Sequence, residues 1–174
     1  FRHLSSPRPE EAAALPPGLW LFPDYLWSAA PNLAVSMAVK AADPRHVTVH
    51  GGPSVPRPEP AGAAFLGAHP HVDVAVRAEG EQTAVELLDA LVRAHDAGAN
   101  FRDHLEGVAG LSFRDPATGA ARRTAERPRL KTLDDLPSPY LDGTLAAWRD
   151  PRIRMAVIET NRGCPYGCTF CDWG

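Results

Sequence analysis

The sequence has little lysine, no excess of positive charge and no long apolar run. Of its 18 basic residues only Lys40 and Lys131 are lysines, and 21 acidic residues leave a formal net charge of −3. A protein that binds nucleic acid would carry clustered positive charge, so this balance argues against a nucleic-acid partner. No apolar run approaches the roughly 20 residues that a membrane-spanning helix needs, and no signal-peptide pattern opens the chain. We therefore expect neither nucleic acid nor a membrane as a partner.

What remains is the composition of an ordinary globular protein. The chain has 174 residues, and 44% of them are hydrophobic, which is enough to bury a core. This length suits one domain, or one domain with part of another. The chain begins at Phe1 and reaches Gly174 three residues after its last cysteine. We expect it to be an internal segment of a longer polypeptide.

Short apolar runs alternate with longer amphipathic segments, which predicts an α/β fold. Strands are expected at 19–22, 46–50, 72–76 and 153–160, helices at 31–43, 59–68 and 81–97, and a β-hairpin over 111–124. Such alternation is typical of βαβ units with a parallel sheet. In these sheets ligands bind beyond the carboxyl ends of the strands.

The segment 81–97 carries the clearest helical pattern. Its larger apolar residues recur at helical spacing, and Gly98 follows where a helix often ends. We expect one apolar face to pack on the core. That face is formed by Val85, Leu88, Leu91 and Val92.

These patterns divide the chain into four parts. Residues 1–18 are rich in proline, serine and arginine and predict a linker or loop. The α/β domain follows over 19–124. Residues 125–151 carry four prolines and little periodicity, which predicts a connector. A second domain is expected to start at 152–174.

All three cysteines fall within eight residues near the end of the chain, at Cys164, Cys168 and Cys171. Their odd number and short spacing argue against disulfides, so they predict a metal site. Structural zinc usually takes four protein ligands, and all seven histidines lie before residue 105; zinc stays as the alternative. Three thiolates on a four-iron cluster would leave one iron open to a substrate or cosubstrate.

The CxxxCxxC spacing, with Phe170 directly before the last cysteine and a strand expected just ahead, resembles the radical S-adenosylmethionine (SAM) enzymes. The resemblance implies a four-iron four-sulfur (4Fe-4S) cluster held by Cys164, Cys168 and Cys171. It also implies that SAM chelates the fourth iron through its amino and carboxylate groups, with Phe170 near the adenine. One electron from an external donor, passed through the cluster, would cleave the sulfonium and yield a 5′-deoxyadenosyl radical.

A second resemblance covers roughly residues 19–145. Four short motifs, each containing glycine or proline, occur in order before the cysteines: GGP at 51–53, HPHVDV at 69–74, RAEGE at 77–81 and LPSPY at 136–140. This set is similar to the cobalamin-binding subfamily of radical SAM proteins. It implies a Rossmann- or flavodoxin-like cobalamin-binding domain over 19–124, incomplete at its N-terminus. The first strand and cluster loop of a radical SAM (β/α) barrel would then begin at 152.

Glycine turns are the candidate cobalamin contacts. At Gly51, Gly52 and Gly80 the backbone amides could approach a phosphate or a corrin amide without side-chain interference. An equally good explanation is that the turns themselves require glycine. Tyr25 and Trp27, in the loop after the first strand, are candidates to flank the corrin face, or to serve only in packing. The Asp-x-His-x-x-Gly pattern that supplies a histidine ligand to cobalt in another cobalamin-binding family is absent, so we expect no such ligand.

The resemblance implies a cobalamin-dependent radical SAM enzyme, most simply a methyltransferase that acts on an unactivated carbon of a small-molecule or peptide substrate. The alternatives are a cyclase or oxidoreductase of the same architecture, or a non-catalytic cobalamin- or metal-binding module. No catalytic residue is assigned, and this chain alone is expected to be inactive. Exposed thiolates and iron–sulfur clusters favour a reducing compartment, which predicts the cytoplasm.

Overall fold

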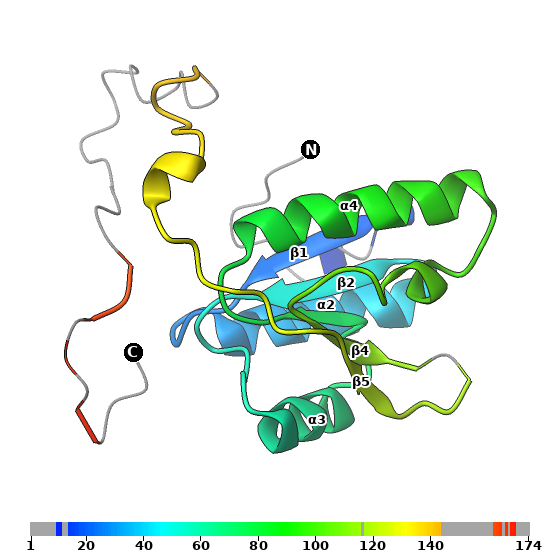
Figure 1. Ribbon diagram of the computed structural model, residues 1–174. Helices are drawn as coiled ribbons and strands as arrows, with labels where there is room; N and C mark the ends of the chain where they lie inside the picture. The colour runs from blue at the N-terminus through cyan, green and yellow to red at the C-terminus, as the bar shows by residue number, and fades with distance from the viewer. Residues whose placement is uncertain are drawn as a thin grey trace. The chain divides into compact units, whose positions relative to one another are not determined.

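The computed structural model describes residues 10–11, 14–115, 117–143, 162–164, 166, 168 and 169. It divides the chain into two units, Phe1–Arg129 and Leu130–Gly174. The sheet and the long helices belong to the first unit (Figure 1). In the second unit a single helical turn, η2 (Leu133–Asp135), begins where the Thr132 hydroxyl accepts a hydrogen bond from the Asp134 amide at 3.1 Å.

The first unit is built on a mixed sheet of five strands in sequential order. These are β1 (Leu19–Pro23), β2 (Val47–Gly51), β3 (Val74–Val76), β4 (Leu111–Arg114) and β5 (Ala121–Arg123). The first three strands are parallel, with Leu21 opposite Val49 and Val49 opposite Val74. The β4–β5 hairpin then runs antiparallel against β3. The carboxyl ends of the three parallel strands therefore share one edge.

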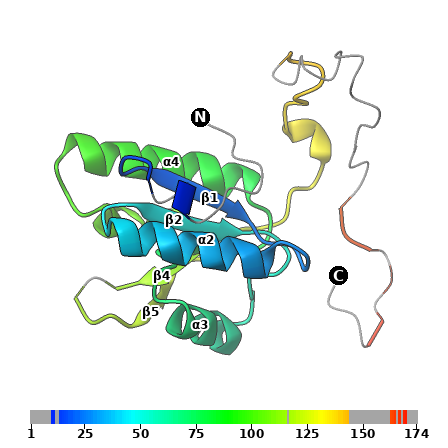
Figure 2. The same ribbon diagram turned by 180° about the vertical axis from the view of Figure 1, so that it is seen from behind.

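Helices cover both faces of this sheet. α2 (Ala29–Ala42) and α3 (Glu59–Ala68) lie on one face, and α4 (Glu81–Asp96) lies on the other with the short helix η1 (Phe101–His104) (Figures 1 and 2). On the α4 face, the core joins Leu87 and Ala90 to valines of β2 and β3 and to Phe113 of β4. On the α2 face, Val35 and Val39 pack against Phe22 of β1. This two-sided cover is what a parallel sheet requires.

The two faces differ chemically because side chains alternate along each strand. Facing α4, β2 presents Val47 and Val49, which pack in the apolar core. Facing α2, it presents Thr48 and His50, both fully buried. His46, just before the strand, is also fully buried, and its Nδ1 accepts hydrogen bonds from the Gly18 amide and the Trp20 indole. Polar groups on that face must therefore find partners inside the protein.

Asp73, at the entrance to β3, ties both helical layers to the sheet. Its carboxylate lies 2.8 Å from the Lys40 ammonium of α2 and also accepts a hydrogen bond from Arg102 of η1. The amide of Thr48 donates to the same carboxylate at 2.8 Å. Asp73 is only 2% exposed, so these partners offset the cost of burying its charge.

Most of the predicted elements are confirmed. The helix expected at 59–68 has those bounds, the helix expected at 81–97 ends one residue earlier, and the hairpin is present. The strand expected at 72–76 is shorter, covering only Val74–Val76. The mixed α/β sheet is consistent with a Rossmann-like fold. The strand predicted at 153–160 lies outside the described residues.

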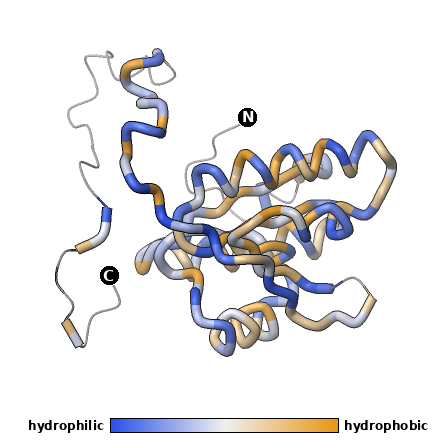
Figure 3. The backbone as a smooth tube through the Cα atoms, in the orientation of Figure 1, coloured by the Kyte–Doolittle hydropathy of each residue, from blue (hydrophilic) through white to orange (hydrophobic). Residues whose placement is uncertain are grey.

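The predicted buried face of α4 is correct only in part, since Leu91 is half-buried and packs against the core while both valines are exposed. Val85 and Val92 are 60% and 58% exposed. The buried positions are instead Thr83, Leu87, Ala90 and Ala94. Polar and apolar residues alternate along α4 (Figure 3), so the pattern admits more than one stripe. The stripe with small side chains lets the helix approach the sheet closely, and the Thr83 hydroxyl donates to the Ala109 carbonyl. None of the helices among the described residues is both long and apolar enough to cross a membrane.

We predict that Asp73→Asn lowers the free energy of unfolding by about 2 to 3 kcal/mol, because it leaves two partly buried cations without their counter-charge. Chemical denaturation of the full-length protein would measure this. Asp103→Asn, at an exposed position of η1, is the control and should change stability by less than about 0.5 kcal/mol. Equal effects of the two substitutions would contradict this role for Asp73.

Candidate functional site

The candidate site is the edge where β1, β2 and β3 end. Three loops follow these strands: residues 24–28, residues 52–58 and residues 77–80. All three glycines singled out from the sequence lie there, since Gly51 ends β2, Gly52 follows it and Gly80 precedes α4. The fold therefore brings Gly51, Gly52 and Gly80 to one edge of a parallel sheet, the place where such sheets bind ligands.

Gly52 is required by the fold itself. Its φ of +110° lies in a region that side-chain-bearing residues rarely adopt. A Cβ at this position would lie 2.8 Å from the carbonyl oxygen of Asp24 and 3.1 Å from its amide nitrogen. The loops after β1 and β2 can approach this closely only because residue 52 has no side chain.

Gly51 and Gly80 have no such requirement. A Cβ on either residue would contact only Val76, at 3.4 Å and 3.7 Å respectively, and neither residue has a positive φ. A third residue of the edge, Ala78, adopts a φ of 59° just before α4 begins. The first-turn amides of α4 have no carbonyl partner within the helix, as at any helix N-terminus. A ligand role for Gly51 and Gly80 stays a prediction, and local sterics do not account for glycine at either position.

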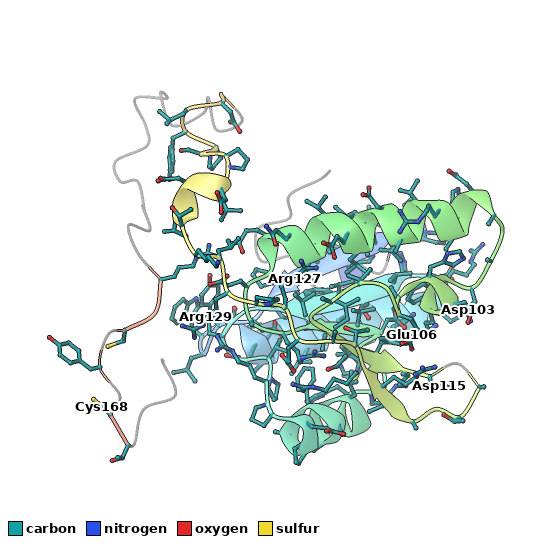
Figure 4. All side chains as sticks on the ribbon, in the orientation of Figure 1. Asp103, Glu106, Asp115, Arg127, Arg129 and Cys168 are labelled. Atoms are coloured by element: carbon teal, nitrogen blue, oxygen red, sulfur yellow. The ribbon has the colours of Figure 1, made fainter. Side chains whose placement is uncertain are left out.

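The third loop begins at Arg77, a buried residue whose structural role the sequence did not suggest. Its side chain is 1% exposed and donates to the Leu111 carbonyl, to the Ser112 hydroxyl at 2.9 Å and to the Thr124 carbonyl at 2.9 Å. Burial lowers the pKa of this guanidinium. Arg127 adds a second link from the segment after β5, donating to the Thr83 hydroxyl of α4 at 2.7 Å (Figure 4).

An exposed aromatic pair stands in the loop after β1. The rings of Tyr25 and Trp27 are stacked, with centroids 5.0 Å apart and planes 7° from parallel. The two side chains are 41% and 77% exposed, although large aromatic residues usually seek burial. A flat apolar surface of this kind suits a flat ligand at the same edge.

Two of the three cysteines lie within the described residues. Cys164 and Cys168 are exposed, with free thiols, and the side chain of Cys168 is labelled in Figure 4. Cys171 and Phe170 lie outside the described residues. Among the described residues, no three histidine, cysteine or acidic side chains are gathered as a metal site. Three cysteines at the CxxxCxxC spacing of the sequence are a donor set suited to an iron–sulfur cluster.

A groove of about 810 Å³ lies at the opposite edge, between α2 and the segment that enters β3. Its lining includes Met37, His69 and His71. Burial lowers the pKa of His71 below its usual value of 6.5, and the neighbouring His69 acts in the same direction. The glycine turns do not line this groove, so it is separate from the candidate site.

Comparison with known proteins finds relatives that match most of the chain. No family model matches the chain. It is 40% identical over 156 residues to the 2-(S-pantetheinyl)-carbapenam-3-carboxylate methyltransferase of Streptantibioticus cattleyicolor. It is 39% identical over 156 residues to the cobalamin-dependent radical SAM methyltransferase TokK of Streptomyces tokunonensis. Each match covers 86% of this chain. The chain belongs to the cobalamin-binding radical SAM family.

Other members of this family catalyse a different reaction. The anaerobic magnesium-protoporphyrin IX monomethyl ester cyclase of Cereibacter sphaeroides is 34% identical over 108 residues, which cover 59% of this chain and 16% of the cyclase. The chain spans about a fifth of the length of the two methyltransferases, since each match covers 21% of the relative. The matches therefore establish the family of this chain, and they do not establish the activity of the whole protein.

We predict that Gly52→Ala lowers the free energy of unfolding by about 2 kcal/mol or more, because the new Cβ meets the Asp24 backbone at a strained φ. Gly67→Ala is the matched control: it lies in α3 with open space around it, and alanine should stabilise that helix by about 0.5 kcal/mol. Thermal unfolding of the two variants gives the comparison. A Gly52→Ala protein as stable as wild type would refute the steric requirement.

Proposed function

We propose that this chain is the cobalamin- and cluster-binding part of a cobalamin-dependent radical SAM methyltransferase. The observation that carries the proposal is the pair of methyltransferases that match 86% of the chain at 39–40% identity. The ordered motifs, the ligand edge of the sheet and the CxxxCxxC sequence support it. When bound, the cluster and SAM would supply a 5′-deoxyadenosyl radical, and cobalamin would supply the methyl group.

Three thiolates of this chain would hold the 4Fe-4S cluster: Cys164, Cys168 and Cys171. This set would leave one iron without a protein ligand and so available to the amino and carboxylate groups of SAM. Phe170, directly before the last cysteine, would lie near the adenine. The exposed thiols of Cys164 and Cys168 are compatible with assembly of a cluster from solution.

The carboxyl edge of the sheet would hold cobalamin. Gly51 and Gly80 leave the backbone accessible there, and the first turn of α4 offers amide donors to a phosphate or to a corrin amide oxygen. The stacked Tyr25–Trp27 pair offers a flat face beside them. The protein thus contributes positioning and exclusion of competing reactions, while the cofactors carry the demanding chemistry.

The substrate proposed for the whole protein is a small molecule or peptide with an unactivated carbon. One relative is named for a carbapenam carboxylate, which is consistent with a natural-product substrate. An external electron donor is a required partner, because the cluster must be reduced once for each radical formed. The oxygen sensitivity of such clusters makes the cytoplasm the proposed location.

A radical SAM cyclase or oxidoreductase is the second candidate, favoured by the 34% identity to the protoporphyrin ester cyclase. Product analysis separates the two candidates. A methyl group derived from SAM in the product supports the methyltransferase, whereas a closed ring without an added methyl group supports the cyclase. A non-catalytic module would give neither product.

We predict about four irons and about one cobalamin per chain in the full-length protein purified anaerobically from cells supplied with cobalamin. Cys168→Ala should abolish the iron content and leave cobalamin bound, because the two cofactors use separate residues. Tyr166→Phe, an exposed neighbour within the same motif, is the control and should retain both. Zinc in place of iron, or a Cys168→Ala protein that keeps iron and turnover, would disprove the cluster assignment.

We also predict that Gly80→Ala weakens cobalamin binding about tenfold, equivalent to about 1.4 kcal/mol, by keeping the ligand away from the backbone. The fold tolerates this substitution, since the new Cβ makes only ordinary contact with Val76. Titration with methylcobalamin, followed by absorbance, measures the affinity, and Gly67→Ala is again the control. Unchanged affinity in Gly80→Ala would mean that the turn alone explains the glycine.

A further inference from the structure

A buried carboxylate stands at the candidate edge, where a ligand would meet the sheet. Asp24 directly follows β1 and is 1% exposed. One of its oxygens, Oδ2, lies 2.7 Å from Nδ1 of His50 on β2. The other, Oδ1, accepts a hydrogen bond from the side-chain amide of Asn32, in α2, at 2.9 Å. This single side chain therefore joins the ends of two strands to the first turn of a helix.

The backbone of Asp24 also connects the loop after β1 to the loop after β2. Its amide donates to the Gly51 carbonyl at 2.6 Å, and its carbonyl accepts from the Ser54 amide at 3.0 Å. The same carbonyl is the atom that a Cβ on Gly52 would meet. Side chain and backbone together hold the loop after β1 against the loop after β2.

The hydrogen bonds continue into the loop that carries the aromatic pair. Ser28 Oγ donates to the Pro23 carbonyl at 2.8 Å and accepts from the Tyr25 amide at 3.0 Å. Asn32 donates to the same Pro23 carbonyl at 2.9 Å. Loop 24–28 is thus fixed at both ends, although Tyr25 and Trp27 themselves are largely exposed.

His50 contributes a hydrogen bond as well as packing. It is fully buried and stacked on Phe22, with centroids 4.6 Å apart. Because Nδ1 faces a carboxylate, Nδ1 carries the proton and donates, and Nε2 has no hydrogen-bond partner among the described residues. A well-packed apolar pair of the same shape would be about as stable as this buried polar pair. Stability alone therefore does not account for the Asp24–His50 pair.

We propose that Asp24 is a positioning residue for cobalamin: through His50 and Asn32 it holds the Tyr25–Trp27 loop against the Gly51–Gly52 turn, so that the surface meeting the corrin is formed before the cofactor arrives. This inference rests on the proposed function. A preformed surface avoids the loss of conformational entropy that ordering a loop on binding would require, and so raises affinity.

The rival explanation is that Asp24 only stabilises the fold. Asp73 provides a matched control, because it is an equally buried carboxylate in the same sheet but lies at the opposite edge. Both Asp24→Asn and Asp73→Asn should lower the melting temperature. Only the first should disturb the edge where cobalamin is proposed to bind.

The experiment titrates the full-length protein and both variants anaerobically with methylcobalamin, at a temperature where all are folded. Asp24→Asn is expected to weaken binding about tenfold or more, and Asp73→Asn less than about twofold. Hydrogen exchange without cofactor should quicken in residues 24–28 of Asp24→Asn and not across the sheet. His50→Phe keeps the stacked ring and loses only the donor, so it should weaken binding to a similar degree. Combined with Asp24→Asn, it should add little, as expected for partners in one interaction.

The outcomes separate the two hypotheses. If Asp24→Asn binds methylcobalamin as tightly as Asp73→Asn does, the positioning role is overturned and the proposed function stands. If the wild-type protein fails to bind methylcobalamin, the proposed function itself fails. Should Asp24→Asn not fold, His50→Phe carries the same test: weakened binding supports the positioning role, and wild-type binding overturns it.

Discussion

The guanidinium of Arg77 joins the two parts of the sheet that run in opposite directions. β3 is the last parallel strand, and the chain then returns as an antiparallel hairpin. A buried cation is tolerated only where acceptors surround it, and here the acceptors come from β4 and from the segment after β5. These hydrogen bonds hold the residue that directly follows β3. The same segment leads through Gly80 into α4 and forms the third loop of the candidate edge.

The elements of the fold follow closely from local sequence, because proline and glycine mark their ends. The HVTVH run at 46–50 predicts a strand, and its alternation also explains why one face of β2 is apolar and the other polar. The buried face of α4 could not be chosen in this way. Val85 and Val92 are the larger side chains, but close packing on a sheet selects the smaller Ala90 and Ala94 instead.

The candidate site also contains both residues that the sequence indicates and residues that it does not. Glycine turns and clustered cysteines are local signals, so the sequence alone indicates Gly51, Gly80 and Cys168 as candidates. Asp24 and His50 are 26 positions apart and become partners only once β1 and β2 lie side by side. Buried polar residues of this kind depend on pairing between distant segments, and no periodicity in the sequence reveals them. Cys171 and Phe170 lie beyond the described residues, and their roles rest on the motif.

The two outer strands of the sheet, β1 and β5, differ in the charge of their side chains. β5 carries Arg122 and Arg123, and charged side chains on an edge strand discourage the addition of another strand. β1, at the other edge, reads Leu-Trp-Leu-Phe-Pro, and Leu21 is 49% exposed. Charge therefore protects the β5 edge against pairing with a further strand, and the residues of β1 carry no charge of that kind.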